Sequence, residues 1–207
     1  MLEVNAQMDL QEQFGSIDIY LFDQLLRGRI PPGARVIDAG CGGGRNLVYL
    51  LRAGYDVCAT DVDPQAVESV QRLAAVLAPH LPSTQFRVEP VERLSFPDAS
   101  ADAVISSAVL HFARDDAQFD AMVRSMWRVL KPGGLLFARL ASTIGIEQQV
   151  MPLDGRRVHL PDGSDRYAVD ADMLTSLTQA LGGRLLDPLK TTVVERQRAM
   201  TTWVVQR

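Results

Sequence analysis

The stretch Arg35-Val-Ile-Asp-Ala-Gly-Cys-Gly-Gly-Gly-Arg-Asn46 decides the fold of this chain. A β-branched run leads into an aspartate and a glycine-rich segment, which is typical of a strand that ends in a loop opening a helix. Glycines let the backbone turn sharply and approach a ligand closely, and the free N–H groups of the following helix donate hydrogen bonds. The stretch therefore predicts a site for a charged cofactor that carries a nucleoside.

The spacing of the glycines distinguishes two classes of cofactor. The dinucleotide pattern G-x-G-x-x-G would require a third glycine where Arg45 stands. The chain instead has D-x-G-x-G-x-G, running from Asp38 through Gly40 and Gly42 to Gly44. A carboxylate at the end of the strand repels a pyrophosphate and attracts an ammonium group. The pattern favours a cationic ligand and disfavours a nicotinamide oxidoreductase.

A second acid follows one strand later. The run Asp56-Val-Cys-Ala-Thr-Asp61 is typical of a short buried strand that ends in a carboxylate. Asp61 lies about twenty residues beyond the glycines, where a doubly wound sheet needs an acceptor for ribose hydroxyls. Asp63-Pro64 then supplies a helix cap and a first-turn proline. The position of Asp61 relative to the glycine loop supports the prediction of a nucleoside cofactor.

Three segments together resemble the class I S-adenosylmethionine-dependent methyltransferases. They are Val36 to Gly44, Thr60-Asp-Val-Asp-Pro64 and Arg128-Val-Leu-Lys-Pro-Gly-Gly134, the last of which looks like the family's link between a helix and its fifth strand. Gly44-Arg45-Asn46 resembles the tellurite-resistance and thiopurine-type members more than the broad family, and Arg45 there either reaches the cofactor carboxylate or meets solvent. The resemblance implies S-adenosylmethionine as cofactor and a small-molecule methyl acceptor as partner.

The resemblance also implies a set of cofactor-binding residues. Gly40 and Gly42 would line the methionine moiety, and Asp38 would attract its ammonium group directly or through water. The family usually has an aspartate where Pro90 stands, so the contact with the adenine amino group would fall to Glu92 or to the backbone. The expected set is Asp38, Gly40, Gly42, Arg45, Asn46, Asp61, Val62, Val91, Glu92 and Ser107.

Hydrophobic periodicity predicts strands that alternate with helices. Such alternation specifies an α/β doubly wound, mostly parallel sheet of seven strands with helices on both faces. Two β-rich runs, 190–195 and 199–205, predict an antiparallel C-terminal hairpin at one edge, as in the methyltransferase family. Gly133-Gly134 is expected to close the helix before the fifth strand. The other expected elements are helices over 11–26, 46–52, 64–77, 119–130 and 171–181 and strands over 56–61, 85–88, 102–108 and 135–140.

Composition limits the classes of protein and partner. With 207 residues, of which 47% are hydrophobic, the chain can bury one core, and we expect a single domain over 1–207. The net charge is −4 and the basic residues are scattered, so the sequence does not indicate a basic patch that would bind nucleic acid or an anionic membrane. Cys41 and Cys58 are expected to be buried, reduced thiols. Because no apolar run reaches membrane length and the start, with Glu3, is not basic, the cytoplasm is the expected location. The oligomeric state stays open.

Two segments are expected to form the substrate side of the site. Residues 142–169 are predicted to be a long irregular insertion leaving the carboxyl edge of the fifth strand, where ligands of open α/β sheets bind. Residues 1–30 are predicted to be mainly helical. They either close over the pocket as a lid, with Tyr20 facing inward, or simply pack on the sheet.

The insertion contains three arginines, Arg156, Arg157 and Arg166, near Tyr167. Such a cluster either recognises a carboxylate or another oxyanion through paired hydrogen bonds, or consists of solvated loop charges. The expected substrate-binding residues are Tyr20, His111, Arg166 and Tyr167.

Methyl transfer needs a base only if the acceptor must lose a proton. His111, which follows the fourth strand, is the candidate catalytic base, and the alternative is that it only shapes the pocket wall. No metal site is expected, because three scattered histidines and two core cysteines lack ligand spacing. The alternative function is a non-catalytic sensor or partner subunit that binds S-adenosylmethionine on the same fold.

Overall fold

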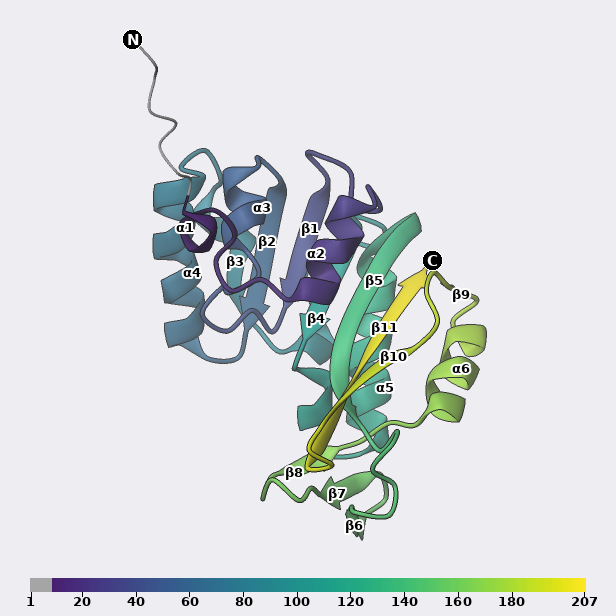
Figure 1. Ribbon diagram of the computed structural model, residues 1–207. Helices are drawn as coiled ribbons and strands as arrows, with labels where there is room; N and C mark the ends of the chain where they lie inside the picture. Colours follow the sequence, from purple (N-terminus) through teal and green to yellow (C-terminus); the bar gives the residue numbers. More distant parts are fainter. Residues whose placement is uncertain (1–8) are drawn as a thin grey trace.

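The computed structural model describes residues 9–207 (Figure 1). Its main sheet has the strand order β10-β11-β5-β4-β1-β2-β3, and the two-residue strand β9 pairs with β11 as an eighth member. The five strands from β3 to β5 are parallel, whereas β11 is antiparallel to β5 and to β10. The predicted fold, a mostly parallel α/β sheet with an antiparallel C-terminal hairpin edge, is therefore confirmed. The strands are β1 (Arg35–Ala39), β2 (Asp56–Asp61), β3 (Phe86–Val88), β4 (Ala101–Ser107), β5 (Leu130–Ser142), β9 (Arg184–Leu185), β10 (Lys190–Val194) and β11 (Arg198–Gln206).

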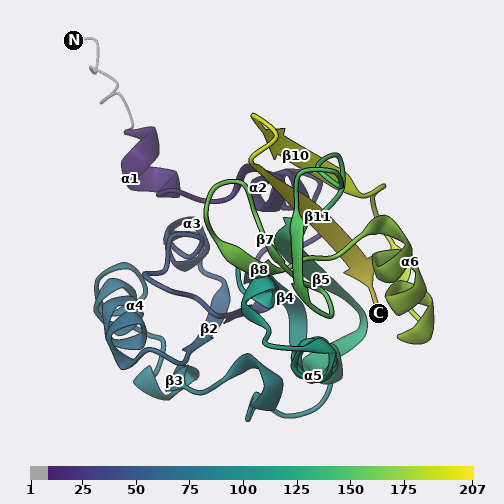
Figure 2. The same ribbon diagram turned by 90° about the horizontal axis from the view of Figure 1, so that it is seen from below.

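The helices cover the sheet from two sides because strand side chains alternate between its faces. Figure 2 shows α5 and α6 on one side of the sheet and α2 on the other. Ile37 of β1 belongs to the apolar cluster beneath α5, and its neighbour Val36 belongs to the cluster beneath α2, α3 and α4. The helices are α1 (Leu10–Phe14), α2 (Ile19–Leu26), α3 (Val48–Arg52), α4 (Pro64–Leu77), α5 (Asp116–Val129) and α6 (Ala171–Ala180), and the short 3-10 turns are η1 (Ser83–Gln85), η2 (Val91–Arg93) and η3 (Leu110–Phe112).

The N-terminal segment differs from the single helix predicted over 11–26. The helix breaks into α1 and α2 because Gly15 adopts a φ of 61° and Asp18 caps a new helix by accepting from the Tyr20 N–H. A Cβ at Gly15 would lie 2.8 Å from Val48 Cγ2, so the break lets α1 approach α3. Leu21 is fully buried, and α2 packs on the sheet. Residues 1–8 of the predicted lid lie outside the described residues.

The fifth strand begins at Leu130, five positions before the predicted start at Leu135. Helix α5 ends at Val129, and the expected helix-closing glycines lie inside the irregular beginning of β5, where the pairing with β4 shifts register. Gly133 has a φ of 82° and its N–H donates to the Arg207 carbonyl. The glycines therefore shape the strand entry next to the C-terminus and do not close the helix.

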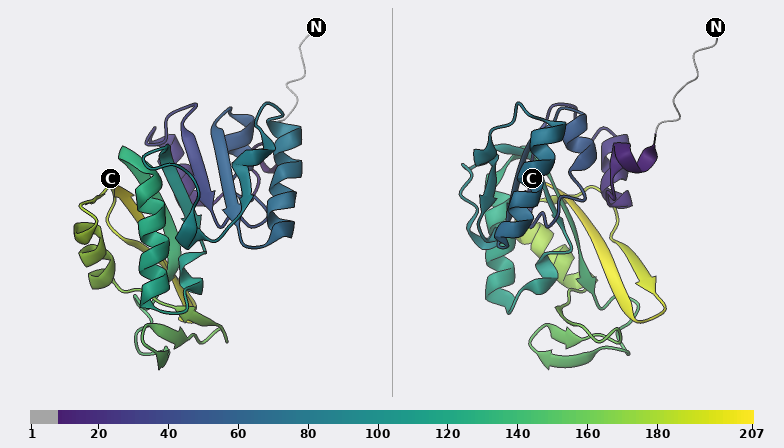
Figure 3. Two further views of the ribbon diagram at one scale, coloured as in Figure 1. Left: turned by 180° about the vertical axis from the view of Figure 1, so that it is seen from behind. Right: turned by 90° about the vertical axis from the view of Figure 1, so that its left-hand side faces the viewer.

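Residues 142–169 were predicted to be irregular, and this prediction is wrong. They contain a small antiparallel sheet of β6 (Met151–Asp154), β7 (Arg157–His159) and β8 (Asp165–Tyr167). Its core contains Val158, Leu160 and Ala168 together with Ala199 of β11. Figures 1 and 3 show this sheet beside the turn of the β10–β11 hairpin, beyond the carboxyl ends of the parallel strands. Among residues 9–207, no helix combines the length and apolarity needed to cross a bilayer.

Candidate active site

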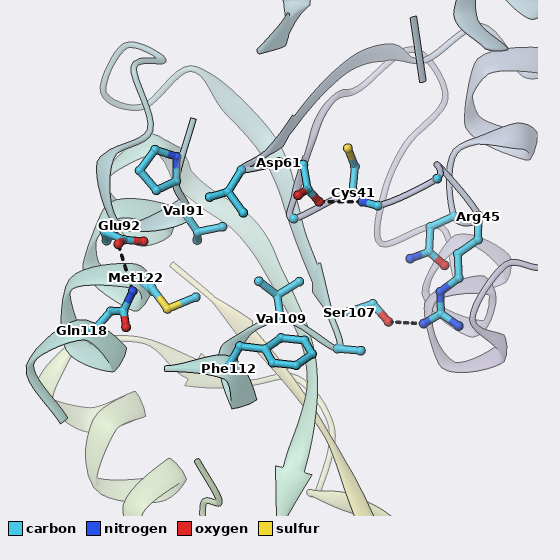
Figure 4. Close-up of a pocket in the computed structure, with 17 residues that line it drawn as sticks. Cys41, Arg45, Asp61, Val91, Glu92, Ser107, Val109, Phe112, Gln118 and Met122 are labelled. Atoms are coloured by element: carbon cyan, nitrogen blue, oxygen red, sulfur yellow. Dashed lines mark hydrogen bonds between the residues drawn. The ribbon is translucent and has the colours of Figure 1, made fainter. Parts of the chain in front are cut away.

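A cavity of about 520 Å³ opens where the strand order reverses between β1 and β4. Open α/β sheets bind ligands at this point, outside the carboxyl ends of the strands. We call it the glycine-loop cavity (Figure 4). Its lining contains Gly40, Cys41, Gly42, Gly43, Arg45, Asn46, Asp61, Val62, Pro90, Val91, Glu92, Ser107, Ala108, Val109, Phe112, Gln118 and Met122. Nine of the ten expected cofactor-binding residues line it, and Asp38 lies behind the wall.

Gly40 and Gly42 have different roles in the structure of the loop. Gly40 has a φ of 85°, and a Cβ there would lie 2.5 Å from Val109 Cγ2, so this glycine allows the loop to touch the segment after β4. Gly42 has a φ of 51°, and a Cβ there would meet nothing within 4 Å. Gly42 therefore leaves space free at the cavity wall.

We expect Gly40→Ala to destabilise the fold by ~1–3 kcal/mol, because Val109 must move and the backbone is strained for alanine. Urea denaturation of the ligand-free protein measures this change. Gly54→Ala is the matched control, since Gly54 has a φ of 76° and open space around its Cβ position. Equal losses in the two variants would show that the contact with Val109 has no structural importance.

Asp61 joins the second strand to the glycine loop. Its Oδ2 accepts from the Gly42 N–H at 2.8 Å, and its Oδ1 accepts from the Asp63 N–H at 3.0 Å. Figure 4 shows the carboxylate directed at the loop, from the cavity wall. The same side chain therefore holds the loop in position and presents negative charge to a ligand.

Asp38 is a buried acid without a hydrogen-bond partner for one oxygen. Asp38 is the penultimate residue of β1 and is 1% exposed. No described residue donates to its Oδ2. Burial raises the pKa of Asp38 to about 7, the positive charge of Arg45 opposes this shift, and the negative charge of Asp61 adds to it. A cation that binds next to this acid would stabilise its ionised form.

Part of the lining of the glycine-loop cavity is apolar. Val62 is 68% exposed and Phe112 is 61% exposed, although both are large hydrophobic residues. The lining also contains Glu92, which accepts at 3.0 Å from Gln118 Nε2 (Figure 4). Exposed apolar side chains beside one oriented polar pair suit a flat heteroaromatic ring.

A second cavity, of about 270 Å³, adjoins the first and shares Arg45 and Ala108 with it. We call it the arginine cavity, because its lining includes Arg139 of β5, Arg166 of β8 and Arg198 of β11. The remaining lining residues are His111, Ala141, Leu160, Asp162, Ser164, Thr192, Val194, Ala199 and Met200.

Two features form the boundary between the cavities. Ala108 has a φ of 65°, which is uncommon for alanine, and its N–H donates to the Arg139 carbonyl. Arg45 Nη2 donates to Ser107 Oγ at 2.9 Å (Figure 4). Asp18, which is buried, accepts at 3.1 Å from Arg139 and lies 4.0 Å from Arg45. The N-terminal segment thereby orders both arginines.

His111 lines the arginine cavity, but its environment does not favour the role of a base. The Ala141 N–H donates to His111 Nδ1 at 3.3 Å, so the neutral ring carries its proton on Nε2. Burial, followed by the charge of Arg166, lowers the pKa of His111 to about 4. A ring held in this state donates a hydrogen bond through Nε2 and has no free basic nitrogen.

The other expected substrate residues divide between two sides of the small sheet. Arg166 and Tyr167 are neighbours on β8, so their side chains leave on opposite faces. Arg166 lines the arginine cavity, whereas the Tyr167 ring stacks on Phe119 and its hydroxyl donates to Asp116. Arg156 pairs with an aspartate, Asp170, on that far side as well. The structure therefore does not bring Tyr167 or Arg156 to the arginine cavity.

Tyr20 lies just outside the arginine cavity. Its hydroxyl is 2.9 Å from Thr192 Oγ1, and the Arg139 guanidinium lies 5.5 Å from its ring centroid. Sequence patterns did not identify several other residues in and around the two cavities as candidate site residues. An aspartate before an apolar run is a helix-cap signal that could have identified Asp18. The unmarked residues are Val109, Phe112, Gln118 and Met122 of the glycine-loop cavity, Arg139 and Arg198 of the arginine cavity, and Asp18, which pairs with Arg139.

A family model described as a methyltransferase domain matches residues 37–138, the segment from within β1 to within β5. The glycine loop, Asp61 and the first half of β5 therefore lie in a segment that is similar to methyltransferase domains. A solved S-adenosylmethionine-dependent methyltransferase from Methanosarcina mazei superimposes with a TM-score of 0.69 at 20% identity, over 88% of this chain and 96% of that one. At that identity the likeness shows a shared fold.

Two curated relatives have similar sequences in the same region. A 2-methyl-6-phytyl-1,4-hydroquinone methyltransferase of Synechocystis is 36% identical over 108 residues, which are 52% of this chain and 32% of that protein. A ubiquinone biosynthesis O-methyltransferase of Methylocella silvestris is 38% identical over 106 residues, 51% of this chain and 39% of that protein. The chain therefore spans less than half the length of either relative.

The glycine-loop cavity fits S-adenosylmethionine, the methyl donor of the family. The unpartnered oxygen of buried Asp38 suits an ammonium group, and Asp61 supplies acceptors for ribose hydroxyls. The exposed apolar side chain of Val62 suits the adenine ring. The cavity volume of about 520 Å³ is in the range of small-molecule sites.

Proposed function

We propose that this chain transfers the methyl group of S-adenosylmethionine to a small molecule bound in the arginine cavity. One observation carries the proposal: the glycine-loop cavity and the arginine cavity meet at Arg45 and Ala108. A donor held in the first and an acceptor held in the second would face each other across this boundary. The names of the two relatives, which describe a hydroquinone methyltransferase and an O-methyltransferase of ubiquinone biosynthesis, support a small-molecule acceptor.

The chain's own residues have a limited set of tasks in this proposal. Asp61 holds the nucleoside end of the donor, Gly42 lines its methionine end, and the charge of buried Asp38 attracts the ammonium group of that end. The sulfonium of bound S-adenosylmethionine supplies the electrophilic methyl group, so the protein contributes binding, alignment and exclusion of water. Holding two reactants in line can contribute roughly 7–11 kcal/mol to lowering the barrier.

His111 has a positioning role in this proposal and does not act as a base. Its Nδ1 accepts from the Ala141 N–H, so Nε2–H is the group available to the arginine cavity. That N–H orients an acceptor oxygen by donating to it. A nucleophile that is already ionised, or that loses its proton to water, is compatible with this arrangement.

Donor binding is expected to depend on pH through Asp38. Its folded-state pKa of about 7 lies above the ordinary value of 3.8, so the acid is protonated in the ligand-free protein below neutral pH. The ligand-free fold therefore loses stability as pH rises from about 4 to 7, whereas the affinity for a cation rises by up to roughly tenfold per pH unit. Above about pH 7 the affinity is expected to level off.

Calorimetric titration with S-adenosylmethionine between pH 5 and 8 measures this dependence. Titrations at pH 6 in buffers of different ionisation enthalpy should also register release of a proton on binding. The variant Asp38→Asn should bind weakly and with a flat profile, because the titrating carboxyl is gone. A flat profile in the unaltered protein would contradict the role of Asp38.

The reaction itself is tested with an isotopically labelled methyl donor. The purified protein is incubated with the donor and a cell extract, and mass spectrometry identifies small molecules that gain the label. A labelled product supports the proposal. Tight donor binding with no labelled product would instead support the non-catalytic sensor.

A further inference from the structure

The arginine cavity is positively charged in a protein whose net charge is −4. Four arginines line it, namely Arg45, Arg139, Arg166 and Arg198, against one carboxylate, Asp162. They come from the glycine loop, β5, β8 and β11, so the fold collects them from segments that are far apart in the sequence. A solvated surface would scatter such charges, whereas this cavity concentrates them.

Two of these arginines are already occupied by protein groups. Arg139 donates to buried Asp18, although its buried Nε has no hydrogen-bond partner in the described part of the chain. Arg45 donates to Ser107 and lies 4.0 Å from the same aspartate. Asp18 therefore balances part of the charge of this pair.

The other two arginines, Arg166 and Arg198, do not pair with carboxylates of the described residues. Within residues 9–207, neither Arg166 nor Arg198 has a carboxylate within 4.0 Å of its guanidinium. The Arg166 guanidinium lies 5.0 Å from the centroid of the Phe112 ring, and one of its nitrogens donates to the Asp165 carbonyl. This stacking fixes the plane of the Arg166 fork at the cavity wall.

The positive charge of these arginines affects the pKa of a neighbouring acid, Asp162. The Ser164 hydroxyl is the largest cause of the lowered pKa of Asp162, and the charges of Arg166 and Arg198 contribute to the same shift. Both guanidiniums are therefore close enough to Asp162 for their positive charges to affect its carboxyl group. Neutral His111 adds an Nε2–H donor beside them without adding an acceptor.

We propose that the arginine cavity binds an oxyanion group of the methyl acceptor, a carboxylate or a phosphate, through the guanidiniums of Arg166 and Arg198 and the donor of His111. Guanidinium forks match such groups with paired, charge-assisted hydrogen bonds, which outweigh the cost of moving the anion out of water. This inference rests on the proposed function, because it assigns the cavity to the acceptor. It names the acceptor's chemical class and the residues that select it.

Binding of simple probes tests the inference without knowledge of the natural acceptor. Benzoate and its neutral analogue benzamide are titrated calorimetrically into the ligand-free protein and into the protein saturated with S-adenosylhomocysteine. Benzoate is expected to bind at least about tenfold more tightly than benzamide, because hydrogen bonds to a charged group are worth about tenfold or more in affinity. Phenyl phosphate in place of benzoate then distinguishes a phosphate from a carboxylate site.

Variants identify the residues responsible. Arg166→Gln and Arg198→Gln should each weaken benzoate at least about tenfold and leave benzamide unchanged. Arg72→Gln is the matched control, since Arg72 is an exposed arginine of α4 outside both cavities and its loss changes the net charge equally. The comparison of benzoate with benzamide needs no variant, so it decides the question even if a variant folds poorly.

Equal binding of benzoate and benzamide, or loss of benzoate binding in Arg72→Gln as large as in the cavity variants, would overturn the oxyanion site. Failure of S-adenosylhomocysteine to bind would overturn the proposed function alone, because the titrations of the ligand-free protein still report on the arginines. Labelled methyl transfer to neutral compounds, with no binding of either anion, would retain the function and reject this inference.

Discussion

Asp61→Ala is expected to weaken binding of S-adenosylmethionine by roughly 100-fold or more, because hydrogen bonds to a charged group contribute ~1.5–3 kcal/mol each and the carboxylate can accept two from the ribose. The loss has a second cause in this structure. Asp61 also accepts from the Gly42 and Asp63 N–H groups, so its removal loosens the loop that contacts the donor. The affinity is measured by calorimetric titration.

Loss of stability must be separated from loss of binding in this variant. The two freed N–H groups should lower the melting temperature of the ligand-free protein by a few degrees, at roughly 2–4 °C per kcal/mol for a chain of this size. Asp63→Ala is the control, since it removes the cap that accepts from the Gln65 N–H at the start of α4. That change costs about 0.5–2 kcal/mol of stability and leaves the cavity lining intact. Equal losses of affinity in the two variants would refute a direct role of Asp61.

Gly42→Leu is expected to reduce donor affinity by roughly 10- to 100-fold, since crowding a filled site with extra methylene groups costs ~1–3 kcal/mol. A Cβ at this position meets no protein atom within 4 Å, so the side chain extends into open space at the cavity wall. The ligand-free fold therefore suffers only the strain of a φ of 51°.

Gly33→Leu controls for that strain. Gly33 has a φ of 75°, equally open surroundings and no part in the glycine-loop cavity. Calorimetry should find normal donor affinity in Gly33→Leu and a large loss in Gly42→Leu, with similar melting temperatures. Undiminished affinity in Gly42→Leu would mean that the donor binds elsewhere.

The cofactor side of the site was largely predictable because local sequence fixes its geometry. A strand, a glycine loop and a helix follow one another between Arg35 and Arg52, and Asp61 ends the strand that pairs with β1. Parallel pairing then brings the ends of β1 and β2 together whatever the rest of the chain does. For this reason Gly42 and Asp61 line one cavity, and Glu92, which follows the strand β3 paired with β2, lines it too, as expected.

The acceptor side was not predictable because tertiary contacts determine it. The apolar residues Val158 and Ala168 are too few for a clear strand period, yet with Ala199 they stabilise the small sheet. That sheet, in turn, directs Arg166 into the cavity and Tyr167 away from it. Arg139 and Arg198 lie within predicted strands or turns, where nothing local distinguishes them from solvated charges.

A crystal structure of the protein with S-adenosylhomocysteine tests the central claim most directly. We expect the adenosyl group beside Asp61 and Val62, with the amino group of the ligand next to Asp38 and its sulfur directed at the boundary formed by Arg45 and Ala108. Density for the ligand on another face of the molecule, or a glycine-loop cavity left empty at saturating ligand, would contradict the account.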